Sequence, residues 1–183
     1  MTIRCDLCVS RTNDGFIVRI QGKGTATHSP AFAAFVKGCL VEDPAATVTA
    51  DLLGCEYLDS TFLGCLLKLQ RTGTAKRFHV VADDAARSRL LTATCVDKYL
   101  TLLSKAPQST GTFLRIEPDE VSKQELGRHM QEAHEVLGEL PSPSASVFKR
   151  IAEQLAHDLE QEEEEQDNSM LFDTAVVTPP PRP

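Results

Sequence analysis

The sequence predicts an α/β fold: a mixed β-sheet that begins with a hairpin and continues through βαβ units, with helices mainly on one face, followed by a C-terminal helical extension. Two β-prone runs flank a tight-turn sequence near the N-terminus. Short β-prone runs then alternate with helical patterns as far as residue 104, and amphipathic helical patterns return after residue 118. Alternation of this kind favours parallel crossovers, which place helices against the sheet.

The first half of the chain supplies the predicted elements in order. Asn13-Asp14-Gly15 tolerates the positive φ angles of a tight hairpin turn. Ser29-Pro30 is expected to open the first helix with Ser29 as its N-cap, and Asp83-Asp84 to cap a later one. The predicted strands are residues 4–10, 15–21, 46–51, 77–82 and 99–103, and the predicted helices begin near residues 29, 60 and 85.

The most informative position is the start of the central helix. Leu63, Leu66, Leu67 and Gln70 recur at the i, i+3, i+4, i+7 spacing of one helix face, so Ser60 is expected to be the N-cap. The positive end of the helix dipole stabilises an anion there, and a phosphate is tolerated. Without further context, the simpler interpretation is a cap that contributes about 1 kcal/mol and nothing more.

The stretch 52–64, LLGCEYLDSTFLG, resembles the signature of STAS domains in the anti-sigma factor antagonist family. In that family a strand ending in Asp-Leu precedes a small-residue turn, an aromatic and an aliphatic residue, and then Asp-Ser-Ser/Thr-Gly-Leu-Gly. The order of elements over residues 4–104 agrees with a STAS-like mixed β-sheet. Phe62 stands where the family has its first Gly, and it is expected to place an apolar ring beside Ser60 on the surface that partners contact.

The resemblance implies a non-catalytic regulator of transcription signalling. Its partner would be an anti-sigma factor or a serine/threonine kinase with an ATPase-type domain, bound when Ser60 is unphosphorylated and released when it is phosphorylated. Added charge and the desolvation of a phosphate would weaken the interface. Ser60 is the expected phosphorylation site, with Thr61 as second choice. The expected partner-binding residues are Asp59, Ser60, Thr61, Phe62, Leu63 and Cys65.

The second half of the chain predicts an extension to a domain at residues 1–104. Residues 105–118 are rich in Pro, Ser, Thr and Gly and predict a linker, and residues 119–166 carry two helical stripes separated by a Pro-Ser break that allows an antiparallel pair. Residues 167–183 are expected to form a disordered tail. The alternative function is therefore a scaffold or oligomerisation module that uses these C-terminal helices, with a homo-oligomer as one form of it.

Composition and local sequence argue against several other classes of function. The net charge of −7 over 183 residues argues against nucleic-acid binding. No run approaches the roughly 20 apolar residues of a membrane span, and the N-terminus resembles no signal peptide, so a cytoplasmic protein without membrane contact is expected. Nucleotide or anion binding at Ser60 is a third, weaker hypothesis because the surroundings are acidic.

No catalytic, metal or cofactor site is expected. Ser60 has no paired base close to it in the sequence, and the Gly-x-Ser-x-Gly pattern is absent. Asp51, Glu56 and Asp59 could hold a cation, although caps and loop anchors use the same residues more often. The six cysteines are expected to be small core residues, because Cys5-Asp6-Leu7-Cys8 has no second pair to complete a zinc site.

Overall fold

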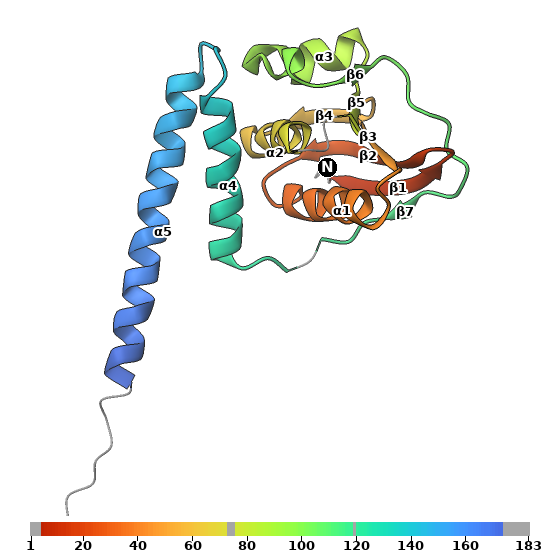
Figure 1. Cartoon of the computed structure of the whole chain (residues 1–183). Helices are drawn as coiled ribbons and strands as arrows, with labels where there is room; N and C mark the ends of the chain where they lie inside the picture. The colour runs from red at the N-terminus through yellow and green to blue at the C-terminus, as the bar shows by residue number, and fades with distance from the viewer. Residues whose placement is uncertain (1–4, 73–75, 119, 174–183) are drawn as a thin grey trace, which may run out of the picture.

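A computed structural model describes residues 5–72, 76–118 and 120–173, with side chains described as far as residue 165 (Figure 1). Strands and helices alternate as predicted and are followed by a helical hairpin. The elements are β1 (Asp6–Thr12), β2 (Gly15–Gly24), α1 (Ser29–Glu42), β3 (Thr47–Asp51), β4 (Cys55–Leu58), α2 (Ser60–Arg71), β5 (Phe78–Val81), α3 (Asp84–Leu90), β6 (Leu102–Leu103), β7 (Leu114–Arg115), α4 (Lys123–Gly138) and α5 (Ala145–Asp173), with two 3₁₀ turns at Thr92–Thr94 and Val96–Lys98.

The strands form one mixed sheet in the order β6-β5-β3-β2-β1-β7, and β4 pairs with β2. β1 and β2 form the predicted antiparallel hairpin, in which Thr12 pairs with Gly15. β2, β3, β5 and β6 run parallel to one another. The predicted α/β architecture, a hairpin followed by parallel crossovers, is confirmed.

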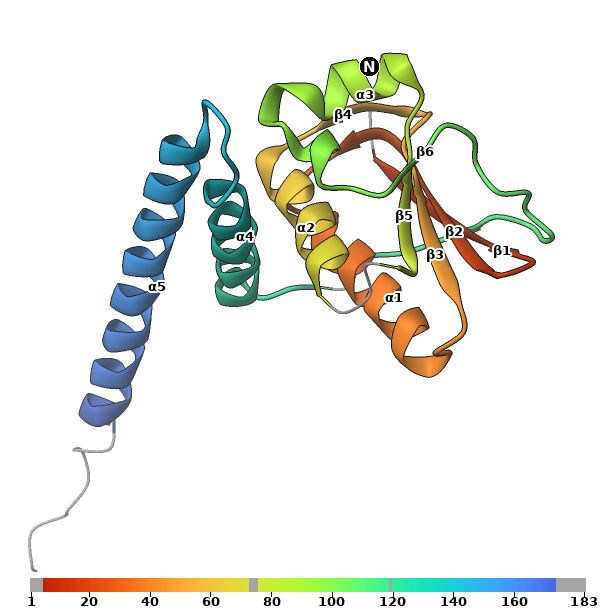
Figure 2. The ribbon, with the colours of Figure 1, turned by 45° about the horizontal axis from the view of Figure 1, so that its top comes forward.

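Helices α1, α2, α4 and α5 form successive layers on one face of the sheet, and α3 lies against β4 (Figure 2). α1 and α2 pack against the sheet, α4 packs on the outer side of α2, and α5 lies along α4. Three fully buried phenylalanine rings pack together in the inner layer. The centroid of the Phe32 ring lies 5.2 Å from that of Phe62 and 6.4 Å from that of Phe78. The core extends into the hairpin, where Leu137, Leu140 and Phe148 are also buried.

Several predicted boundaries differ from the structure. The turn expected after residue 51 contains β4, because the chain at residues 55–58 completes backbone hydrogen bonds along the end of β2. The predicted strand at 99–103 is reduced to β6, and the predicted helix at 85–95 ends at Leu90 and continues as 3₁₀ turns. Asp83 is the expected N-cap of α3 and accepts a hydrogen bond from the Ala86 amide at 2.7 Å.

The predicted linker at 105–118 contains part of the sheet. β7 pairs antiparallel with β1, so that Val9 lies opposite Leu114, and the Ile116 amide donates to the Leu7 carbonyl at 2.8 Å. The prediction was based on the Pro, Ser and Thr content of this segment. Without β7, β1 would be an edge strand with unpaired backbone groups that attract another strand. The sheet therefore reaches almost to the start of α4.

The C-terminal helices also begin and end at other residues than predicted. α4 begins with a capping box between Ser122 and Glu125, five residues after the predicted linker ends. α5 continues to Asp173, which is within the predicted tail, and residues 174–183 lie outside the described part of the chain. No helix in the described part is long and apolar enough to cross a membrane.

Candidate functional site at the start of helix α2

Asp59, not Ser60, is the N-cap of α2, so the predicted cap was wrong by one residue. One Asp59 carboxylate oxygen accepts a hydrogen bond from the Phe62 amide at 2.9 Å, and the other accepts from the Ala26 amide at 2.6 Å. A carboxylate can satisfy two backbone donors at once, which a hydroxyl does less well. Asp59 therefore ties the β2–α1 loop to the start of α2, and the Ser60 hydroxyl is left free for another partner.

That partner is a histidine of α4. The Ser60 hydroxyl lies 2.9 Å from Nε2 of His134, and Nδ1 of the same ring lies 2.7 Å from the Met130 carbonyl oxygen. A carbonyl oxygen only accepts, so Nδ1 donates to it, and in the neutral ring Nε2 accepts the Ser60 proton. His134 is 3% exposed and Ser60 is half-buried. Sequence reasoning found no base near Ser60 because the two residues are 74 positions apart.

The start of α1 is held by α4 in the same way. Ser29, expected to be the N-cap, is instead the first residue of α1 and is fully buried, and its hydroxyl lies 2.8 Å from Nε2 of His129. Burial lowers the pKa of His129, and neighbouring lysines add to this while Glu132 opposes it. Two histidines of one helix thus contact the first residues of the two helices that cover the sheet.

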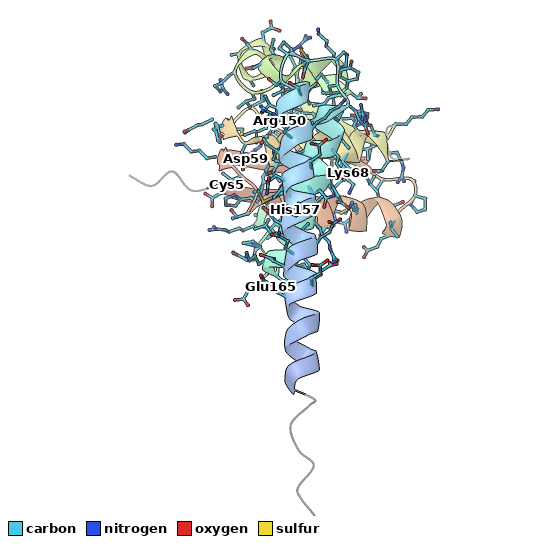
Figure 3. The ribbon with its side chains drawn as sticks, turned by 90° about the vertical axis from the view of Figure 1, so that its left-hand side faces the viewer. Cys5, Asp59, Lys68, Arg150, His157 and Glu165 are labelled. Carbon is cyan, nitrogen blue, oxygen red and sulfur yellow. The ribbon has the colours of Figure 1, made fainter. Side chains whose placement is uncertain are left out.

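α4 approaches α2 so closely that only glycine fits between them. A Cβ atom on Gly64 would lie 2.2 Å from the Ala133 carbonyl oxygen. Towards the C-terminal end of α2, Lys68 pairs with Glu132, and Arg71 pairs with Glu139 at 2.5 Å. Figure 3 looks onto α5 and shows the labelled Asp59 and Lys68 on opposite sides of it. α4 and α5 therefore cross over α2 between its first and third turns.

Four of the predicted partner-binding residues are buried. Thr61, Phe62, Leu63 and Cys65 are 0–4% exposed. The Phe62 ring packs in the core against Phe32, so the expectation that it lies beside Ser60 on the surface is wrong. Gly24 makes room for it, since a Cβ there would lie 3.1 Å from the ring. The side chain points to the sheet because the inner face of α2 is the face that must be buried.

Cys65 shares this buried environment. Its thiol lies 3.7 Å from the Ser29 carbonyl oxygen, and burial raises its pKa to about 12. All six cysteines are free. Such a thiol is a small packing group rather than a nucleophile.

Asp51 and Asp59, two of the three acidic residues of the central turn, have partners of their own. Asp51 pairs with Arg19 at 3.2 Å and accepts from the Leu53 amide at 3.0 Å, and Asp59 bonds two amides as described. Within the described ranges, no three His, Cys, Asp or Glu side chains are grouped as a metal ion would require. These carboxylates act here as caps and loop anchors.

The comparisons with known proteins give a likeness of fold. No protein-family model and no curated protein matches the chain. Among solved structures, the chain is similar to a crystal structure described as an anti-sigma factor antagonist from Mycobacterium paratuberculosis, with 24% identity and a TM-score of 0.48. The match covers 57% of this chain and 90% of the other. A functional proposal must therefore be supported by the site itself and by the sequence motif around Ser60.

Proposed function

We propose that the protein is an anti-sigma factor antagonist-like regulator that switches partners through Ser60. In this proposal it binds an anti-sigma factor or serine kinase when Ser60 is unphosphorylated and is released when Ser60 is phosphorylated. The observation that supports it most is the environment of Ser60. Its hydroxyl is the first side chain of α2, lies beside the Asp59 carboxylate, and is engaged by another segment at 2.9 Å.

A phosphate on Ser60 would change this site strongly. It adds nearly two negative charges next to Asp59 and replaces the hydroxyl that lies 2.9 Å from Nε2 of His134. Any interface built on the hydroxyl would lose its hydrogen bond and face a desolvation cost. A loss of about 3 kcal/mol corresponds to more than a hundredfold in affinity.

The test compares tagged Ser60→Ala and Ser60→Asp proteins in pull-downs read by mass spectrometry. Recovery of an anti-sigma factor or ATPase-domain kinase with the Ala form and its loss with the Asp form is expected. Ser88→Asp is the matched control, because it adds the same charge at an exposed position on α3. Equal recovery of the partner by the two Ser60 variants would contradict the switch.

A scaffold or oligomerisation module is the second candidate. It is favoured by the length of α5, which runs antiparallel to α4 and continues past Lys123, the first residue of α4, with no other described element beside it (Figure 1). Such a helix end is available to a second copy or another protein. Light scattering of the full chain over a range of concentrations would test self-association, and a constant monomer mass would argue against it.

A further inference from the structure

The outer side of α2 carries a continuous stripe of four residues: Ser60, Gly64, Lys68 and Arg71. Residues three and four positions apart are neighbours on a helix surface, so these side chains follow one another down the helix. The stripe offers a hydroxyl at its start, a gap at Gly64 and two cations at its end. We call it the α2 stripe.

α4 matches each feature of the α2 stripe. The backbone of Ala133 fills the gap at Gly64, and the Ala133 side chain is 1% exposed. Glu132 pairs with Lys68, and Glu139 pairs with Arg71. His134 accepts a hydrogen bond from the Ser60 hydroxyl. A small residue lets two helix backbones approach closely, and the flanking charges fix the register and direction of the approach.

The contact between α2 and α4 consists of exposed ion pairs and a buried apolar part. The ion pairs are partly exposed, with Glu132 and Glu139 side chains 50% and 63% accessible, and exposed ion pairs of this kind add little to stability. The buried part includes Ala133, His134 and Leu137, and it continues into the core through Leu140. α4 thus combines an apolar contact with a specific charge pattern, and a competing helix of similar chemistry would have to match both.

We propose that the α2 stripe is a docking surface for an acidic helix with a small residue at the crossing point. In this chain α4 occupies that surface, and the external partner binds by presenting a helix of the same chemistry in its place. This inference rests on the proposed function and deepens it, since it names the contact surface and the kind of partner. Phosphorylation of Ser60 would remove the hydroxyl contact from α4 and from the partner helix alike.

The test uses a peptide of residues 121–141 as the probe, which keeps the Ser122–Glu125 capping box of α4. It is titrated into the full chain and into a full-length variant with Glu132→Lys, Ala133→Leu and Glu139→Lys. These changes lie on α4 alone, so the α2 stripe stays intact while its internal occupant is weakened. Fluorescence anisotropy reports binding, and hydrogen exchange locates it.

The peptide should bind the triple variant at least tenfold more tightly than it binds wild type, because internal α4 lowers the fraction of open surface. It should protect α2 amides from exchange. A peptide carrying Glu132→Lys and Glu139→Lys should bind at least tenfold more weakly to the same variant. Glu135→Lys is the matched protein control, since the Glu135 side chain accepts a hydrogen bond from Gln131 of its own helix, and it should behave as wild type.

Two results would overturn the inference: equal binding of the peptide to wild type and to the triple variant, or no binding to a triple variant with released α4. If the triple variant does not fold, the variant with Glu132→Lys and Glu139→Lys alone provides the same comparison. Neither phosphate nor a second protein is used in this experiment. Its failure is therefore distinct from failure of the Ser60 pull-down, which tests the switch itself.

Discussion

Replacing Gly64 with Ala inserts one methyl group between α2 and α4. The new Cβ would lie 2.2 Å from the Ala133 carbonyl oxygen and 2.6 Å from its carbonyl carbon, whereas ordinary contacts begin at 3.4 Å. Helix α4 must retreat by roughly 1 Å, since the obstructing atoms are backbone and cannot rotate away. Overpacking of this kind costs about 1–3 kcal/mol.

The same substitution favours α2 as a helix, because Ala is better than Gly there by about 1 kcal/mol. The two effects act on different elements, so they can be separated by site-resolved hydrogen exchange. Amides of α4 should exchange about 5- to 150-fold faster, in line with a loss of 1–3 kcal/mol. Amides of α2 and of the central strands should remain protected.

Gly38→Ala is the matched control, because Gly38 lies within α1 and a Cβ there meets nothing within 4 Å. It should raise the free energy of unfolding by up to about 1 kcal/mol and leave α4 exchange unchanged. If α4 exchange in Gly64→Ala is unchanged or slower, the close crossing does not exist in solution. The interpretation of the α2 stripe would then fail with it.

Three further predictions concern the same site. Asp59→Ala should lower the free energy of unfolding in urea by about 1–2 kcal/mol, because it removes the cap of α2 and its bond to Ala26, while Asp59→Asn, which keeps an acceptor, should cost less. Burial lowers the pKa of His129 below its ordinary 6.5, so the unfolded chain binds this proton more readily. The contribution of His129 to the free energy of unfolding should therefore be complete above pH 6.5 and should fall as the pH drops from 6.5 to the lowered folded-state pKa. His129→Gln should reduce this pH dependence in thermal melts. Cys65, with a pKa of about 12, should react with thiol reagents only on unfolding, whereas the half-buried Cys8 should react in the native protein; equal native rates would contradict this packing.

Local patterns in the sequence predicted the hairpin and the parallel crossovers of the sheet, but not β4 or β7. The hairpin turn at residues 13–15, the alternation of strands and helices, and the Asp83 cap depend on neighbours in the chain, and all are found in the structure. The importance of Ser60 came from the motif around it and from its place at a helix start. These features could be predicted because dihedral preferences and hydrophobic periodicity act over a few residues.

Only the tertiary structure decided what surrounds Ser60. The cap passes to Asp59 because that carboxylate also bonds Ala26, which lies 33 residues away, and the base facing Ser60 comes from His134 across 74 residues. The burial of Phe62 on α2 depends on the space left by Gly24 on β2. No local preference encodes such pairings, because they form only when separate elements pack. The sequence by itself thus determined the hairpin, the crossovers and the place of Ser60 at the start of a helix, and packing determined that α4 covers it.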